Sequence, residues 1–365
     1  MAKKQTPFSK DIISWFKKSQ RKLPWRETEN PYLIWVSEVM LQQTQVKQVL
    51  EYYQNFIDKF PDVFALAQAD LQDVLKAWEG MGYYARARNL YRASKIVIEK
   101  FDGRIPSDYQ NFRRLPGVGN YIAAAVLSQA FNTPLAVVDG NVKRVLARQF
   151  LIDQPVNHTP MKNVFQERAD LLLDVERPGD FNQALMELGA LICRPQNPKC
   201  DQCPVSSYCQ AYQKNQQHQL PITTKRKMTP VYHIAVGVVH KNSHILITQR
   251  KPSGLLGGLW EFPGGKVEDG ETAELACVRE VKEKTNISVA ISDYLTQVNH
   301  AYTHFRITVD VFRCDYLNGD VVLNGPYDYR WVTHPEIDQF PFHVSNQKII
   351  FFLKKNLSKQ VHFDL

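Results

Sequence analysis

The sequence lacks any long uninterrupted hydrophobic run. No stretch approaches eighteen consecutive apolar residues, roughly the length that a helix needs to cross a bilayer, so we expect no membrane span. The N-terminal sequence MAKKQTPFSKD carries lysines without an apolar segment behind them, which is not the pattern of a secretory signal peptide. No internal repeat is apparent either, because the two halves differ in charge, periodicity and motif content.

Cysteine is scarce and unevenly placed. Four of the six cysteines crowd into residues 193–209 with the spacing C-x6-C-x2-C-x5-C, while Cys277 and Cys314 lie apart. Since we expect no leader peptide, this clustering indicates metal ligation in a reducing compartment rather than disulfides. Four thiolates can close on one iron–sulfur centre or on one structural zinc, and the residues alone leave both possible. The predicted ligands are Cys193, Cys200, Cys203 and Cys209.

In the first part of the chain, acidic residues are fewer than basic ones. The net charge of +8 divides into +9 for residues 1–228 and −1 for residues 229–365. An anionic partner such as nucleic acid is therefore expected to bind the first part.

The stretch 115–145, LPGVGNYIAAAVLSQAFNTPLAVVDGNVKRV, carries the strongest local signal. Gly117 and Gly119 break a helix and expose backbone N–H groups, and the next helix is predicted to begin at about Asn120. Free amides at the positive end of a helix form a ready site for a phosphate. The stretch could also be only a turn between packed helices.

Two carboxyl groups are candidates for acid–base chemistry. Asp139 ends the apolar run 135–138 and precedes a basic helix, where a helix N-terminus favours its ionised form, although Asp is also a common N-cap. Glu38 lies in a predicted helix that is apolar nearly all round over residues 33–41. Burial raises the pKa of a carboxyl group and suits it to act as a general acid, unless it pairs with a Lys or Arg. We expect the two pKa values to be shifted in opposite directions.

The hairpin with an Asp at this distance resembles the helix-hairpin-helix motif of the DNA glycosylases related to endonuclease III. The sequences LPWR at 23–26, SEVMLQQTQV at 37–46 and GMGYYARARNL at 80–90 resemble the MutY family of adenine glycosylases. The resemblance implies that Glu38 protonates adenine and that Gln43 and Tyr83 enter the duplex beside the opposing base, although Tyr83 could equally be a core aromatic. The DNA-binding residues that it implies are Arg26, Gln43, Thr44, Met81, Tyr83, Gly117, Gly119, Lys143 and Arg144.

Tyr121 departs from the relatives that also cut the DNA strand. Those relatives carry a Lys here that forms a Schiff base with the sugar, which a phenol cannot do, so we expect a monofunctional enzyme. The resemblance further implies that Tyr121 hydrogen-bonds Asp139, with Asn141 close by. The cysteine spacing matches the [4Fe-4S] loop of the same group, in which Arg194 and Lys199 would face a phosphate backbone.

The second half changes to strand-like patterning after the polar, glutamine-rich residues 210–229. VYHIAVGVV and ILITQR flank a short turn, and FRITVDVFRCDY is a further predicted strand. GGLWEFPGGKVEDGETAELACVREVKEK resembles the Nudix box, in which a glycine loop precedes a helix whose glutamates bind magnesium around a diphosphate. The matching residues are Gly265, Glu271, Arg279, Glu280, Val281 and Glu283. Lys284 replaces the next glutamate and Asn286 the expected glycine, so diphosphate hydrolysis is not expected.

A MutT-like domain of this kind reads 8-oxoguanine in the MutY family. Its Phe-Ser-His sequence aligns here with Tyr302, Thr303 and His304, so the hydroxyl group is retained, although His304 could be an ordinary strand-end histidine.

We therefore predict a multidomain chain with an all-α helix-hairpin-helix glycosylase domain at 1–212, a linker at 213–229 and an α/β Nudix-like domain at 230–365. The predicted protein is a monomeric, cytoplasmic and nucleoid-associated enzyme of base excision repair. Its predicted partner is double-stranded DNA with adenine opposite 8-oxoguanine or G. Alternatives are a thymine mismatch glycosylase of the same superfamily, a Nudix hydrolase with a DNA-binding domain, and a non-catalytic iron–sulfur DNA-binding protein. No feature identifies a protein partner such as a sliding clamp or a mismatch-repair protein.

Overall fold

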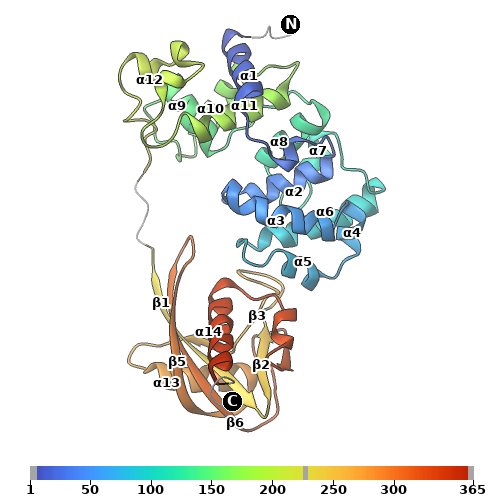
Figure 1. Cartoon of the computed structure of the whole chain (residues 1–365), viewed down its shortest axis with the longest axis vertical. Helices are drawn as coiled ribbons and strands as arrows, with labels where there is room; N and C mark the ends of the chain where they lie inside the picture. Colours follow the sequence, from blue (N-terminus) through green and yellow to red (C-terminus); the bar gives the residue numbers. More distant parts are fainter. Residues whose placement is uncertain (1–5, 225–228, 361–365) are drawn as a thin grey trace. The chain divides into compact units, whose positions relative to one another are not determined.

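A computed structural model describes residues 6–224 and 229–360 of the chain (Figure 1). They form two compact units, one made of the described residues up to 67 together with 92–224, and the other of residues 68–91 together with 229–360. The predicted linker lies partly outside the described residues, at 225–228. Within the described ranges, no helix has both the length and the apolar character that a bilayer crossing requires.

The first unit is helical, and its elements are α1 (Pro7–Ser19), η1 (Pro24–Arg26), α2 (Pro31–Leu41), α3 (Val46–Lys59), α4 (Val63–Gln68), most of α6 (Ala85–Phe101), α7 (Tyr109–Arg113), α8 (Asn120–Phe131), α9 (Gly140–Gln149), α10 (Met161–Leu172), α11 (Pro178–Leu191), η2 (Cys200–Gln202), η3 (Ser206–Tyr208) and α12 (Gln210–Gln213). Helix α2 packs against α8, and α11 packs against α1, α8 and α9. Phe165, Phe181 and Leu188 are buried at the centre of one core cluster.

The local signals place the helices that carry the candidate site. Asn30 caps α2 and Pro31 occupies its first turn, while residues 34–40 are all buried, as the apolar pattern predicted. Helix α8 begins at Asn120, and α9 begins directly after Asp139, as predicted from the glycines and the apolar run. These helix starts therefore follow from the sequence.

The second unit is an α/β fold whose elements are α5 (Leu71–Ala77), β1 (Val231–Lys241), β2 (His244–Gln249), β3 (Trp260–Glu261), β4 (Gly264–Lys266), α13 (Ala273–Thr285), β5 (Ser288–Ala301), β6 (Arg306–Asn318), β7 (Asp328–Val332), η4 (Glu336–Gln339) and α14 (Val344–Gln360). The mixed sheet has the order β3-β2-β1-β6-β5, with β4 paired to β1 and β7 to β2. Strands β1 and β6 run parallel, whereas β1 and β2 form the predicted antiparallel hairpin.

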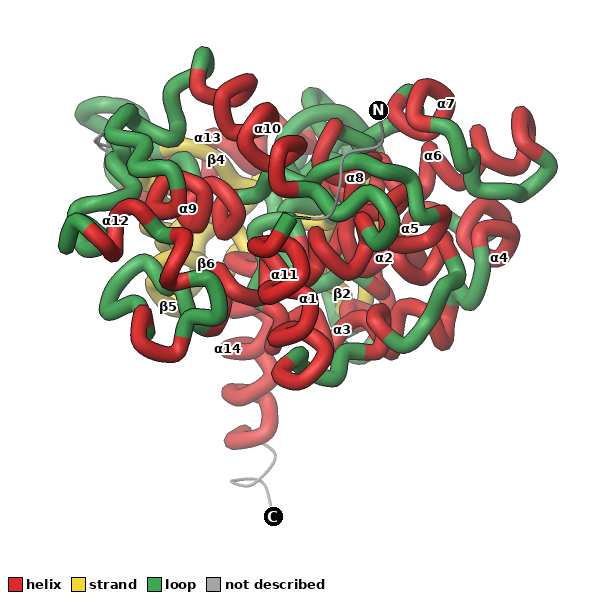
Figure 2. Tube along the Cα trace, turned by 90° about the horizontal axis from the view of Figure 1, so that it is seen from above, coloured by secondary structure: helices red, strands yellow, loops and turns green. Residues whose placement is uncertain are grey.

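Helices cover both faces of this sheet. Val236 and Val238 of β1 pack in one core with residues of α14, and the alternating residues Ala235 and Val239 pack in another with α13. Helix α13 also lies against β4 (Figure 2). Burial on both faces explains why β1 is apolar over most of its length.

Residues 68–91, which the sequence placed in the first domain, pack with the C-terminal residues. The indole Nε1 of Trp260 donates to Gln72 Oε1 at 2.9 Å, and Arg88 Nη1 donates to the carbonyl of Gly257 at 2.8 Å. Their packing depends on contacts between segments far apart in the sequence.

Candidate active site

The first unit contains a cavity of about 480 Å³, a volume typical of small-molecule sites. Four of the predicted catalytic residues line it together: Glu38 from α2, Tyr121 from α8, and Asp139 and Asn141 at the start of α9. Residues from three helices and from positions about a hundred apart in the chain thus face one space.

Glu38 is 2% exposed in the middle of the apolar helix α2. Its pKa is raised to about 7, chiefly by burial; the hydrogen bond from Tyr121 lowers the pKa and the charge of Asp139 raises it. A carboxyl group with a pKa near neutrality holds a proton that it can donate, as predicted for a general acid.

Tyr121 has a different partner from the one predicted. Its hydroxyl donates to Glu38 Oε2 at 2.9 Å, not to Asp139. The prediction missed this because α8 packs against α2, which brings the phenol to Glu38. Tyr121 therefore orients the candidate acid.

Asp139 is the N-cap of α9 and a pocket residue at once. Its Oδ1 accepts from the backbone N–H of Val142 at 2.7 Å, and its Oδ2 accepts from Asn141 Nδ2 at 3.0 Å. Burial nevertheless raises the pKa of Asp139, since it outweighs these hydrogen bonds. The expectation of opposite shifts for Glu38 and Asp139 was wrong, because both carboxyl groups are buried in the same cavity.

Helix α9 is fastened to α11 and to the cysteine loop. Arg144 donates to Asn141 Oδ1 and to the carbonyl of Gly189, both at 2.8 Å, and to the carbonyl of Cys193 at 2.7 Å. It is 9% exposed and holds these elements together, and the DNA contact of Arg144 stays a prediction. At Gly189, an added Cβ would lie 2.6 Å from Asn141 Cβ, so only glycine permits this approach of the two helices.

An ion-pair network that sequence reasoning missed forms one wall of the cavity. Glu187 of α11 is 1% exposed and accepts hydrogen bonds from Arg21 at 2.6 Å and from Arg26 at 2.9 Å. Burial alone would raise the pKa of Glu187, but these two arginines hold it at about 2. The sequence did contain a signal for Glu187, because it is the one acidic residue in the largely apolar FNQALMELGALI, just as Glu38 is the one acidic residue in its helix. Arg26, predicted to bind DNA, is thus a wall residue of the cavity.

The predicted phosphate site keeps its open geometry. Gly117 has φ +79°, which favours glycine, and Gly119 is the N-cap of α8 without a side-chain cap. An added Cβ at Gly119 would meet no atom within 4 Å. The first turn of α8 therefore remains accessible to an anion.

The residues expected to enter the duplex share an uncommon backbone conformation. Gln43, at φ +56°, and Tyr83, at φ +46°, are non-glycine residues in the left-handed region, and both are exposed. Tyr83 and Thr303 both belong to the second unit, and the Tyr83 hydroxyl contacts Thr303 Oγ1 there. The Met81 side chain is buried, at 4% exposure. Its contact with DNA stays a prediction. Thr44 lines the cavity, and Lys143 lies on α9.

The four clustered cysteines share one neighbourhood. The pKa of Cys203 is raised to about 12, chiefly by burial, and the other three thiols act in the same direction. Arg148 of α9 donates to Cys193 Sγ at 3.2 Å and to the carbonyl of Arg194 at 2.8 Å. Among the residues that the structure describes, no three His, Cys, Asp or Glu side chains are arranged to hold a metal ion. The donor set fits an iron–sulfur group in its chemistry, since four sulfur ligands lie on one short loop.

The residues predicted to read the opposing base lie at the tip of the β5–β6 hairpin. Thr303 and His304 are exposed there. The Tyr302 hydroxyl lies 3.2 Å from Ser345 Oγ, and its ring stacks at a tilt on Phe305, 4.7 Å between centroids. Tyr302 is therefore held by the body of the unit, while its two neighbours stay accessible.

Comparisons with known proteins agree with this division. Residues 36–169 match the HhH-GPD superfamily of base excision DNA repair proteins, residues 193–209 the iron–sulfur binding domain of endonuclease III, and residues 235–351 the NUDIX domain. A thermostable thymine-DNA glycosylase of known structure is 32% identical, with a TM-score of 0.52, over 57% of this chain and 95% of that one.

Curated relatives extend over both units. The adenine DNA glycosylase of Mus musculus is 35% identical over 91% of this chain and 75% of its own length. That of Buchnera aphidicola subsp. Baizongia pistaciae is 34% identical over 83% of this chain and 84% of its own length. With matches of this identity and coverage, together with a cavity that holds the paired carboxyl groups, the chain belongs to the adenine DNA glycosylase family.

Proposed function

We propose that this chain excises adenine from duplex DNA where adenine stands opposite 8-oxoguanine or G, and that it does so without cutting the strand. The observation that carries the proposal is the shared cavity, in which Glu38, with its raised pKa, and Asp139 face the same space. Family membership supports adenine as the base.

The reaction requires the nucleotide to leave the base stack, because its glycosidic bond is inaccessible within the duplex. The open amides at Gly119 suit the strand phosphate that holds the nucleotide in this position. Glu38 then donates its proton to the adenine ring, and the electrons of the C1′–N9 bond leave with the base. Asp139 stabilises the positive charge that remains on the sugar. Water adds at C1′, and its released proton returns to Glu38.

Tyr121 supports the absence of lyase activity. Its phenol stands in the cavity and is bonded to Glu38, and it cannot form a Schiff base. Lys47 also lines the cavity but is exposed. Borohydride should therefore trap no covalent complex between the protein and an abasic product.

We propose a [4Fe-4S] cluster as the group on the cysteine loop, with Cys193, Cys200, Cys203 and Cys209 as its ligands. The match to an iron–sulfur binding domain supports it. When bound, the cluster would join the four cysteines of the loop to one another. The loop also carries Arg194 and Lys199, both exposed, which suit contact with a phosphate backbone. Visible absorbance of the purified protein tests for the cluster, and a colourless zinc protein would contradict it.

The central test uses duplexes with A opposite 8-oxoguanine, A opposite G, and T opposite G, followed by alkali to reveal abasic sites. We expect cleavage of the A strand in the first two only, and none without alkali. Glu38→Gln should lose at least about 10²-fold in single-turnover rate, since a positioned general acid contributes that much. Asp139→Asn should also lose most of the rate. Undiminished turnover in Glu38→Gln would reject the assignment.

The second candidate is a thymine mismatch glycosylase, which the 32% identity to a thymine-DNA glycosylase favours. That likeness covers 57% of this chain, whereas the adenine DNA glycosylase of mouse matches 91% of it. Release of thymine from the T opposite G duplex would support this alternative.

A further inference from the structure

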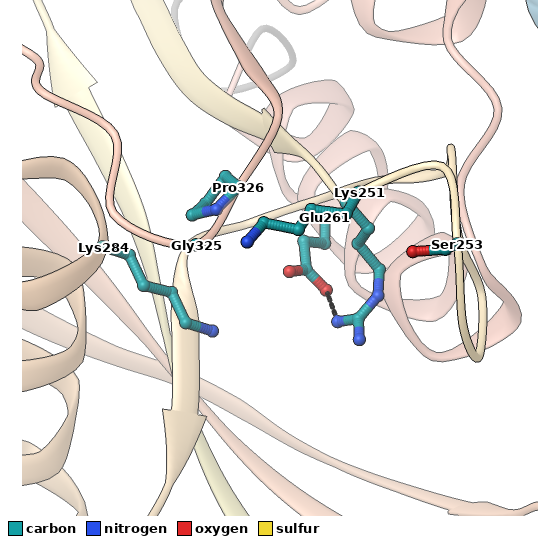
Figure 3. Close-up of a pocket in the computed structure, with 7 residues that line it drawn as sticks. Lys251, Ser253, Glu261, Lys284, Gly325 and Pro326 are labelled. Carbon is teal, nitrogen blue, oxygen red and sulfur yellow. Dashed lines mark hydrogen bonds and ion pairs between the residues drawn. The ribbon is translucent and has the colours of Figure 1, made fainter.

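The second unit contains a pocket of about 230 Å³ at the place where its sequence departs from the Nudix pattern. Figure 3 shows the side chains of Ser253, Glu261 and Lys284 pointing toward a common space. The residues that line it are Arg250, Lys251, Ser253, Glu261, Lys284, Gly325 and Pro326. Three cationic side chains thus face one carboxylate, so the lining has a net positive charge even when Glu261 is ionised.

Lys284 places a fixed charge in this pocket. Its ammonium group donates to the carbonyl of Gly264 and lies 3.7 Å from Glu280 Oε2 on the same helix. It occupies the position at which the Nudix box has a metal-binding glutamate. An ammonium at this position repels a divalent cation and attracts an anion.

The other two cations keep donors for a ligand. Arg250 Nη1 pairs with Glu261 Oε2 at 2.7 Å, while its buried Nε has no hydrogen-bond acceptor in the described part of the chain. Lys251 is exposed, and no ion pair or hydrogen bond of its side chain is found among the described residues. Guanidinium and ammonium groups form their strongest hydrogen bonds with charged oxygens.

We propose that this pocket binds a phosphate group without a metal ion, and that the lysine at position 284 supplies the positive charge that magnesium supplies in a Nudix hydrolase. The phosphate belongs either to the DNA backbone or to a free nucleotide, since both present the same anionic oxygens. The Ser253 hydroxyl adds a neutral donor at the rim. The site binds and does not hydrolyse, because no metal-bound water is generated there.

The experiment titrates the full chain with inorganic phosphate and with a deoxynucleoside monophosphate in EDTA, and reads binding by calorimetry. Lys284→Gln and Lys251→Gln should each weaken binding about tenfold, because each removes one charged donor. Lys282→Gln is the matched control, since Lys282 lies on the same helix but is absent from the lining and donates to the carbonyl of Asn286. Thermal unfolding of each variant checks the fold, and Lys251→Gln keeps the test valid if Lys284→Gln unfolds.

Binding of an undamaged duplex over a range of salt concentrations separates the two sources. A backbone phosphate in the pocket lowers the slope of log affinity against log salt by about one in Lys284→Gln. A free nucleotide leaves that slope unchanged while the variant loses affinity for the monophosphate. Equal phosphate affinity in the parent, Lys284→Gln and Lys251→Gln overturns the proposal, as does binding that requires magnesium. None of these readings uses adenine excision, so they stand even if the proposed activity fails.

Discussion

Replacing Glu38 by Gln should make the protein more stable while it lowers the rate of adenine excision by at least about 10²-fold. The pKa of Glu38 rises from 4.5 to about 7 because the side chain is buried at 2% exposure. The folded state therefore binds a proton more tightly than the unfolded state, and stability falls as pH rises from about 4.5 to about 7. Gln cannot ionise, yet its amide oxygen can still accept the hydrogen bond from Tyr121.

The size of the gain follows from the shift. A pKa of about 7 in the folded chain against 4.5 in the unfolded chain corresponds to about 3 kcal/mol in the free energy of unfolding once both states are ionised, near pH 8. At pH 5 the same linkage gives less than about 1 kcal/mol. Urea unfolding of the parent and of Glu38→Gln at pH 5 and pH 8, followed by the fluorescence of the buried Trp25 and Trp35, measures the difference.

Glu187→Gln is the opposing control in the same cavity wall. The pKa of Glu187 is held at about 2 by Arg21 and Arg26, so its ionised form contributes stability that is fully present above pH 4.5 and is lost as pH falls toward 2. Its replacement should destabilise the protein by about 3 kcal/mol at pH 7. If Glu38→Gln and the parent unfold at the same urea concentration at pH 8, Glu38 is not a desolvated acid and the mechanism fails.

Three further predictions concern the same site. The single-turnover rate of adenine excision should be high below pH 7 and fall above it, because Glu38 then loses its proton; a rate that rises through this range would contradict its role. Tyr121→Phe should move this fall to higher pH, since the hydrogen bond that it removes lowers the pKa of Glu38, and a pH profile of the variant checks the direction. Gly189→Ala should cost about 1–3 kcal/mol of stability and reduce excision, because its Cβ would overlap Asn141. Gly140→Ala, whose added Cβ meets no atom within 4 Å, serves as the control, and equal effects in the two variants would refute the packing argument.

The sequence was sufficient for features that arise from neighbouring residues. The buried α2, the start of α8 at Asn120 and the start of α9 after Asp139 follow from apolar runs, glycines and caps. The β1–β2 hairpin likewise follows from two apolar runs around a short polar turn. Each of these features depends on a pattern of neighbouring residues that can be recognised in the sequence.

Features that depend on distant packing were not predictable in the same way. Strands β5 and β7 and the helix α14 were not predicted from the sequence. The partner of Tyr121 depends on how α8 meets α2, and the pKa of Asp139 depends on its burial. The role of Glu187 in the cavity wall depends on its ion pairs with Arg21 and Arg26, which lie far from it in the sequence.

Helix α9 carries the candidate stabilising carboxylate at one end and Arg148, which grips the cysteine loop, at the other. The helix has ten residues, so its backbone hydrogen bonds join the two ends directly, at a rise of about 1.5 Å per residue. A change in the position of the cysteine loop is therefore expected to change the position of α9 and of the Asp139 carboxylate. A protein with a disordered cysteine loop would therefore still bind DNA, but its Asp139 carboxylate would be misplaced relative to the sugar.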